Sequence, residues 1–194
     1  MSTVFFDVDT QIDFLYPAGA LYVPGAEGLI PNLGRLSQCA AAKGIPVIST
    51  MDAHAENDPE FRQWPPHCVA GTFGQQKAQA TLLDGRAAVP SHRVDFDLAG
   101  ARQVILEKQA TDCFTNANIH DVLARLDATH CVLYGVVTEV CVRQAALGLL
   151  RTGKHVEVVT DAVHCLSEEN ARRFYDEFTA AGGRLTTVAE VCAA

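Results

Sequence analysis

Residues 131–151 read CVLYGVVTEVCVRQAALGLLR, and this stretch indicates the fold of the whole chain. Its first residues, up to Tyr134, form an apolar run that predicts a buried strand, and the short link GVVT follows directly. Residues 139–151 then show the apolar spacing of an amphipathic helix, with these residues on one face: Val142, Ala145, Ala146, Leu149 and Leu150. A buried strand leading into such a helix is typical of α/β folds.

Cys141 lies in the first turn of this predicted helix, which is a place where a sulfur can become a nucleophile. Backbone N–H groups in a first turn have no intrahelical partner, and the positive end of the helix dipole lies there. Both features stabilise a thiolate, so we expect a lowered thiol pKa. The same N–H groups can hold a developing oxyanion. The alternative is that Cys141 is a small buried apolar residue without chemistry.

The composition indicates one globular domain spanning residues 1–194, long enough to bury a sizeable core. Hydrophobic residues make up 48% of the chain and charged residues 20%, which is an ordinary balance. A formal net charge of -8 without any Lys/Arg-rich run argues against nucleic-acid and membrane partners. The start has no basic signal-peptide segment, and no apolar run approaches a membrane span, so we expect a cytoplasmic protein. The 7 cysteines include no CxxC pair and favour reduced thiols.

Short apolar runs alternate with longer amphipathic ones along most of the chain. We predict strands at residues 3–8, 46–51, 103–108, 130–136, 155–160 and 184–188. We predict helices at residues 26–43, 116–126, 139–151 and 168–181. The least regular stretch, residues 52–102, has one short predicted helix near residues 75–83. This alternation predicts a three-layer, doubly wound α/β fold of Rossmann type, with a six-stranded, mostly parallel sheet and helices on both faces.

Chemically active side chains follow the predicted strands in order. In open α/β sheets ligands bind at the carboxyl ends of the strands, so the residues found there are candidates for a site. Each has a structural alternative, such as a turn, a solvated strand end or, for Asp161, a cap. His164 is a further candidate, as the partner of a Cys–His pair. The strand ends carry Asp9, Asp52 with His54, Lys108, Cys141 and Asp161.

Asp52, His54 and His67 form a candidate metal site. Residues two apart in an extended segment point to the same side, so Asp52 and His54 can meet one ion. His67 follows in WPPHC, a segment stiffened by two prolines. One Asp and two His ligands with open positions suit zinc, iron(II) or manganese(II). The alternative is a solvent-facing loop without metal.

Several sequence blocks together resemble one known family across nearly the whole chain. They are VDTQIDF, MDAH, WPPHCVAGTFG and GVVTEVCVRQ, with Lys108 at its strand end. The chain is similar to the nicotinamidase branch of the isochorismatase-like cysteine hydrolases. The resemblance implies a catalytic set of Asp9, Lys108 and Cys141, without a histidine beside the thiol.

The resemblance also implies the remaining parts of a site. One divalent metal ion, zinc first with iron or manganese as alternatives, would be held by Asp52, His54 and His67. A cis peptide bond would join Val136 to Val137, so that the N–H groups of Val137 and Cys141 form an oxyanion hole. Phe14 and Trp64 match positions that wall the substrate ring.

The activity implied by the resemblance is hydrolysis of nicotinamide to nicotinate and ammonia through a Cys141 thioester, with Asp9 as the base. The partner would be a small-molecule amide, and family members often form dimers or tetramers. Two segments depart from the nicotinamidase pattern, namely the short loop between His54 and Trp64 and the segment QATDCFTN after Lys108. We therefore keep a first alternative, a family hydrolase acting on another amide, a ureido compound or a vinyl ether. The second alternative is a non-catalytic binding module that bears a thiol or a metal.

Overall fold

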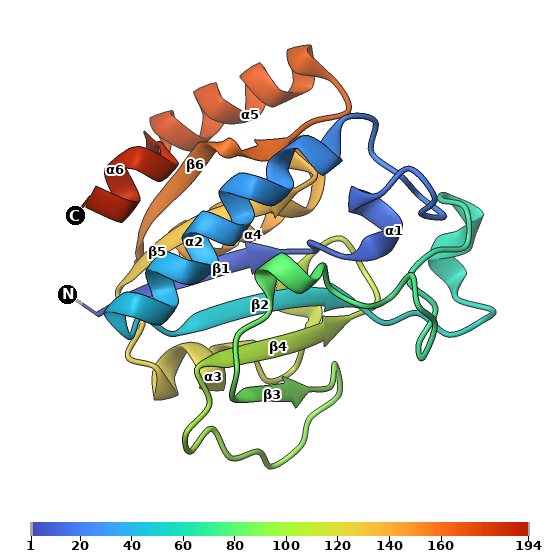
Figure 1. The fold of residues 1–194 in the computed structure, drawn as a ribbon, viewed down its shortest axis with the longest axis horizontal. Helices are drawn as coiled ribbons and strands as arrows, with labels where there is room; N and C mark the ends of the chain where they lie inside the picture. Colours follow the sequence, from blue (N-terminus) through green and yellow to red (C-terminus); the bar gives the residue numbers. More distant parts are fainter. Residues whose placement is uncertain (1, 194) are drawn as a thin grey trace.

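The computed structural model describes residues 2–193, which build one seven-stranded parallel sheet (Figure 1). The strand order is β3-β4-β2-β1-β5-β6-β7, and every neighbouring pair is parallel. Parallel strands of this kind are buried on both faces, which explains their nearly continuous apolar sequences. The strands are β1 (Thr3–Val8), β2 (Val47–Asp52), β3 (Arg86–Val89), β4 (Gln103–Lys108), β5 (His130–Val136), β6 (His155–His164) and β7 (Arg184–Thr186).

Helices cover both faces of this sheet, as predicted. Successive strand residues point to opposite faces, so Phe5 and Phe6 of β1 belong to two different apolar cores. The core around Phe6 includes residues of α3 (Ile119–Arg125), α4 (Arg143–Arg151) and α5 (Glu168–Ala180). The core around Phe5 includes residues of α1 (Ile12–Leu15), α2 (Ile30–Lys43) and α6 (Val188–Ala193). Figure 1 shows α2 in front of the sheet and α3 and α4 behind it.

The predicted count of six strands is wrong, because β3 adds a seventh at the edge of the sheet. This strand has only four residues, two of them exposed, and it lies in the stretch that we predicted to be irregular. A short, half-exposed edge strand has too weak a periodicity to stand out in sequence. The short helix expected near residues 75–83 is a single 3₁₀ turn, Gln79–Thr81. The last predicted strand ends early, because Val188 already begins α6.

The direction of the sheet reverses at β1, which lies between β2 and β5. The chain first adds strands on the β2 side and later returns to add β5 on the other side, so a topological switch point lies between β1 and β5. Gly135 of β5 has φ 122°, and a Cβ atom there would lie 2.0 Å from the carbonyl oxygen of Val8. Only glycine therefore allows the two strands to approach so closely at the switch point.

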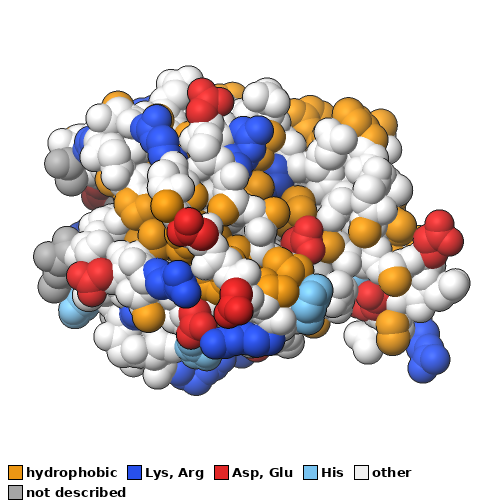
Figure 2. All heavy atoms as spheres, turned by 90° about the horizontal axis from the view of Figure 1, so that it is seen from below, with side chains coloured by type: hydrophobic (Ala, Val, Ile, Leu, Met, Phe, Trp, Pro, Cys, Tyr) orange, Lys and Arg blue, Asp and Glu red, His pale blue; other side chains and the backbone are white. Residues whose placement is uncertain are grey.

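No helix within residues 2–193 is long and apolar enough to cross a membrane. On the face shown in Figure 2, acidic and basic side chains are interspersed between apolar ones.

Candidate active site

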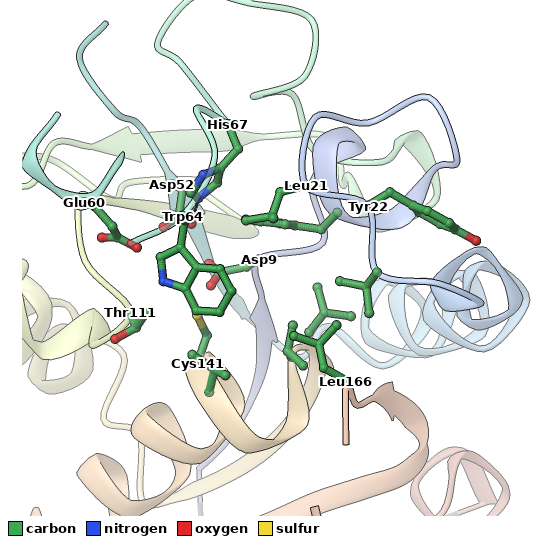
Figure 3. A pocket seen from close by; sticks show the side chains of 15 residues that line it. Asp9, Leu21, Tyr22, Asp52, Glu60, Trp64, His67, Thr111, Cys141 and Leu166 are labelled. Carbon is green, nitrogen blue, oxygen red and sulfur yellow. Dashed lines mark ion pairs between the residues drawn. The ribbon is translucent and has the colours of Figure 1, made fainter. Parts of the chain in front are cut away.

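The carboxyl edge of the sheet collects the chemically active side chains. Asp9 directly follows β1, Asp52 ends β2 and Lys108 ends β4. Cys141 lies in a helical segment that follows β5. Figure 3 shows Asp9, Asp52 and Cys141 converging on one pocket, together with residues from the loops.

Lys108 lies at the centre of this group and is fully buried. Its Nζ lies 2.9 Å from Asp9 Oδ2 and 4.0 Å from Cys141 Sγ, and it donates a short hydrogen bond to Asp52 Oδ1. Asp9 is also held from the other side, because Thr50 Oγ1 donates a 2.6 Å hydrogen bond to its Oδ1. The structure thus brings the three predicted catalytic residues together around one ammonium group.

Burial and charge act differently on these groups. Burial raises the pKa of the Asp9 carboxyl, and the attraction of Lys108 offsets this only in part. Burial alone would lower the pKa of Lys108, but Asp52 and Asp9 outweigh it and raise that pKa well above its usual value. Burial likewise opposes ionisation of Asp52, yet Lys108 and the two histidines hold its pKa well below its usual range. Lys108 and Asp52 are therefore a charged pair at neutral pH.

The expectation of a lowered thiol pKa at Cys141 is wrong. Burial raises this pKa well above its usual value, and the neighbouring Lys108 only partly offsets the effect, while Asp9 and Asp52 add to it. The sulfur also does not lie in the first turn of an α-helix. A π-helical turn, Thr138–Val142, precedes α4, so the predicted helix at residues 139–151 consists of two segments. Cys141 therefore rests as a thiol and needs a base.

The three predicted metal ligands meet in one buried cluster. Their ligand atoms all lie within 4.8 Å of one another. Asp52 Oδ2 lies 3.9 Å from His54 Nε2 and 3.8 Å from His67 Nε2. The Nε2 atom of His54 is buried and has no hydrogen-bond partner within residues 2–193, although such atoms are normally satisfied. An orphaned imidazole nitrogen facing a carboxylate is the arrangement expected for a divalent ion, so these residues fit a metal.

The opposite nitrogens of both imidazoles lie close to oxygen atoms, as a hydrogen bond at His67 and as an ion-pair contact without hydrogen-bond geometry at His54. His67 Nδ1 lies 2.7 Å from the carbonyl oxygen of Pro65, and His54 Nδ1 lies 3.1 Å from Asp58 Oδ2. Such partners orient histidine ligands and raise their basicity. Asp58 was not singled out in the sequence beyond its place in the short loop, because its distance to His54 depends on how that loop folds.

A pocket with an empty volume of about 530 Å³, partly open to solvent, connects the metal cluster to Cys141. Both predicted wall residues, Phe14 and Trp64, line this pocket. The ring of Phe14 lies 5.4 Å from that of His67, between centroids. The pocket is walled mostly by apolar side chains, including Leu21, Val23, Val136, Val137, Val140 and Leu166.

The peptide bond between Val136 and Val137 is cis, as the resemblance implies. Val137 precedes the π turn, and its carbonyl oxygen accepts hydrogen bonds from Val140 N at 3.0 Å and Val142 N at 3.2 Å. Val137 and Cys141 both line the pocket. Their backbone N–H groups stay our candidates for an oxyanion hole.

Two other strand-end candidates lie outside this pocket. Asp161 Oδ1 accepts a 2.8 Å hydrogen bond from Val188 N, the first residue of α6, so it caps a helix. His164 Nε2 lies 2.8 Å from the carbonyl oxygen of Pro24 and is not among the residues that line the pocket. A Cys–His pair is therefore not formed.

Several residues that support the site were missed in the sequence. The Gln11 amide clamps the backbone of Asp52, donating to its carbonyl oxygen at 2.9 Å and accepting from its N–H at 2.7 Å. The buried Asp13 carboxylate accepts from Cys68 N at 2.7 Å, next to His67. Both residues belong to the block VDTQIDF, but nothing in one sequence says which backbone groups they reach. Glu60 also lines the pocket, and burial, followed by repulsion from Asp52, raises its pKa.

Comparisons with known proteins agree with this geometry. The sequence profile described as the Isochorismatase domain matches residues 3–190. The nicotinamidase of Escherichia coli is 26% identical over 205 residues, covering 94% of this chain and 93% of that protein. The solved structure of Pyrococcus horikoshii pyrazinamidase in complex with zinc has a TM-score of 0.80 and 28% identity, covering 96% of this chain and 99% of that one.

A second solved structure points to a different substrate within the same fold. The N-carbamoylsarcosine amidase of Thermoplasma acidophilum has a TM-score of 0.79 and 25% identity, and the match covers 97% of both chains. The profile match spans almost the whole chain and includes every residue of the site described above. The chain therefore belongs to the isochorismatase family.

Proposed function

We propose that this protein is a metal-dependent cysteine amidohydrolase whose main substrate is nicotinamide, converted to nicotinate and ammonia. The observation that carries the proposal is one apolar pocket that joins Cys141 and Asp9, both in contact with Lys108, to a buried Asp/His/His cluster. The relatives described as nicotinamidase and N-carbamoylsarcosine amidase are amidohydrolases, and the chain is a hydrolase that acts on carboxamide C–N bonds.

Asp9 is the base in this proposal. Its raised pKa makes it a better proton acceptor than an exposed aspartate, which narrows the pKa difference from the partly buried thiol. Lys108 faces both groups, so its positive charge stabilises the thiolate as the proton moves from Cys141 Sγ to Asp9. The sulfur then attacks the amide carbon, and the N–H groups of Val137 and Cys141 hold the oxyanion.

The same carboxyl group completes the reaction. Protonated Asp9 gives its proton to the departing nitrogen, so ammonia leaves and a thioester on Cys141 remains. Asp9 next removes a proton from a water molecule, which attacks the thioester carbon. Collapse of this second tetrahedral intermediate releases the carboxylic acid and returns the proton to the sulfur.

Substrate orientation comes from the far side of the pocket. Asp52, His54 and His67 would hold a divalent ion, zinc first, which supplies a Lewis acid able to fix a heteroaromatic nitrogen when it is bound. Phe14 and Trp64 would lie against the faces of a flat ring, since both line the pocket between the metal cluster and Cys141. A planar aromatic amide with a ring nitrogen matches both requirements.

The test is ammonia release from nicotinamide by zinc-loaded protein, compared with Cys141→Ala and with Cys192→Ala as a matched control in α6. We expect rapid release by the native protein and the control, and a loss of about 10⁴-fold or more in Cys141→Ala, because the nucleophile is gone. Measurable hydrolysis by Cys141→Ala at a comparable rate would refute the scheme.

A second candidate substrate class is the ureido compounds, favoured by the likeness to N-carbamoylsarcosine amidase. This class would be supported if metal-loaded protein releases no ammonia from nicotinamide while iodoacetamide still alkylates its Cys141 rapidly. That result would keep the cysteine hydrolase and replace the substrate. The cytoplasmic location and the assembly into dimers or tetramers stay predictions.

A further inference from the structure

A second buried ion pair joins β1 to the loop after Gly74. Lys77 Nζ lies 3.1 Å from Asp7 Oδ2, and both residues are almost completely inaccessible, at 4% and 0% exposure. Neither lines the pocket. Burying two charges carries a desolvation penalty that the attraction within the pair barely offsets. Such a pair beside a reactive centre therefore invites a role beyond stability.

The pair joins three segments that build the site. Asp7 is in β1 and accepts hydrogen bonds from Thr10 Oγ1 and from Ser49 Oγ of β2, each 2.8 Å long. Lys77 Nζ also donates a 3.0 Å hydrogen bond to the carbonyl oxygen of Thr50. The backbone around Lys77 pairs with that of Gln11, the residue that clamps Asp52. The pair therefore holds β1, β2 and the loop after Gly74 in one arrangement.

Thr50 connects this pair to the proposed base. Its carbonyl oxygen accepts from Lys77, while its Oγ1 donates to Asp9 Oδ1 at 2.6 Å and accepts from Asp9 N at 3.2 Å. Asp9 has φ 49°, a left-handed conformation that is unfavourable for a non-glycine residue and that depends on such contacts. The direction of the Asp9 carboxylate is thus set by Thr50 on one side and by Lys108 on the other.

We propose that the buried Asp7–Lys77 pair is a positioning device for Asp9, acting through Thr50. It fixes the Thr50 backbone, the Thr50 hydroxyl fixes Asp9 Oδ1, and Asp9 Oδ2 is left facing Lys108 and the thiol. Lys77 also neutralises the buried charge of Asp7. The inference rests on the proposed role of Asp9 as the base.

The experiment is a double-mutant cycle between the pair and its connecting residue. Removing both charges with Asp7→Asn/Lys77→Met avoids a buried unpaired ion, and Thr50→Val removes the hydroxyl that holds Asp9. Each change is expected to lower kcat about 10- to 100-fold while KM changes little, because a small misplacement of a catalytic group has this size of effect. Thr50→Ser, which keeps the hydroxyl, is expected to restore kcat.

The decisive result is non-additivity. In the Thr50→Val background, Asp7→Asn/Lys77→Met is expected to cause no further loss, because the pair is proposed to act on Asp9 through the Thr50 hydroxyl. The exposed pair Arg93–Asp121, neutralised as Arg93→Met/Asp121→Asn, is the matched control and should leave kcat unchanged. Losses that multiply in the combined variant, or native kcat in the paired variant, would overturn the proposal.

Two further measurements distinguish an effect on the position of Asp9 from a loss of folded protein and from a wrong choice of substrate. Circular dichroism and denaturant titration give the folded fraction, and every rate is expressed per folded molecule. The rate at which iodoacetamide modifies the Cys141 peptide should fall in the same non-additive pattern, and it does so whatever the amide substrate is. Ammonia release that is absent even from native protein would therefore reject nicotinamide, whereas the alkylation series would still test the pair.

A milder variant covers the case in which Asp7→Asn/Lys77→Met does not fold. Ser49→Ala removes one hydrogen bond to Asp7 and leaves the charges in place. We expect a smaller loss of kcat that again disappears in the Thr50→Val background. Equal fractional losses in both backgrounds would overturn the proposal.

Discussion

Two lysines are buried among carboxylates on this molecule, and they differ in what else they face. Lys108 touches Asp9 and Asp52 and lies 4.0 Å from the Cys141 sulfur, and these three partners all line the pocket. Lys77 touches Asp7 and a backbone carbonyl in a sealed network of hydroxyl groups. A buried charge is therefore no sign of catalysis by itself. Catalysis is indicated by a buried charged group that contacts a reactive side chain lining a pocket.

The largest expected effect is the difference in kcat between substitutions of the two lysines. Lys108→Met should lower kcat about 10²- to 10³-fold, because the group that stabilises the thiolate and orients Asp9 is lost. Lys77→Met should lower kcat less, although both substitutions leave buried carboxylates unpaired and should each cost about 3–5 kcal/mol of stability. The measurement is kcat per folded molecule beside the free energy of unfolding.

The kcat losses caused by the two lysine substitutions should differ even more in the Thr50→Val background. The loss caused by Lys108→Met should persist there in full, because Lys108 contacts Asp9 directly, whereas the loss caused by Lys77→Met should vanish. A Lys108 loss that Thr50→Val masks would contradict the distinction between them.

The next effect concerns the affinity for zinc, which residues of the active site should influence and the Asp7–Lys77 pair should not. Asp58→Asn removes the charge 3.1 Å from His54 Nδ1 and should weaken zinc binding about 10- to 100-fold, as loss of such partners typically does. Glu56→Gln, in the same loop and exposed, is the control. Zinc affinity is measured by competition with a chromophoric chelator. Equal affinities of the two variants would show that Asp58 does not orient the ligand.

The Asp7→Asn/Lys77→Met variant should bind zinc with native affinity, because its network reaches Asp9 rather than the imidazoles. A weakened zinc affinity in that variant would mean that the sealed network also supports the metal ligands.

The smallest effect concerns the pocket wall. Trp64→Ala should raise KM for nicotinamide about 3- to 10-fold, because contact between two aromatic rings contributes roughly 0.5–1.5 kcal/mol. Phe73→Ala removes an aromatic ring that is 71% exposed and does not line the pocket, so KM should stay native. Steady-state kinetics on both variants decides the point. A KM in Trp64→Ala equal to that of the control would remove Trp64 from the substrate site.

The residues around Lys108 could be predicted from the sequence, because hydrophobic periodicity locates the ends of the strands. Asp9, Asp52 and Lys108 each follow an apolar run, and parallel strands bring such ends together. The Asp7–Lys77 pair could not be predicted in the same way. Lys77 lies in the irregular stretch between residues 52 and 102, and its reach to Asp7 depends on how that loop lies against β1.

The direction of the thiol pKa at Cys141 was also beyond the sequence. Helix position argued for a lowered pKa, but the depth of burial decides, and depth is set by residues that are distant along the chain. The same holds for β3, whose four residues pair with β4 only because the sheet offers a free edge there. Local pattern predicts elements and their ends, whereas packing decides burial and loop contacts.

The most direct measurement is acid quenching during nicotinamide turnover, followed by mass spectrometry of the peptide that contains Cys141. The proposed mechanism predicts a nicotinoyl group on Cys141, and added hydroxylamine should divert part of the product to the hydroxamate. Turnover with an unmodified Cys141 peptide at every quench time, and with no hydroxamate formed, would contradict the proposal that Cys141 is the nucleophile.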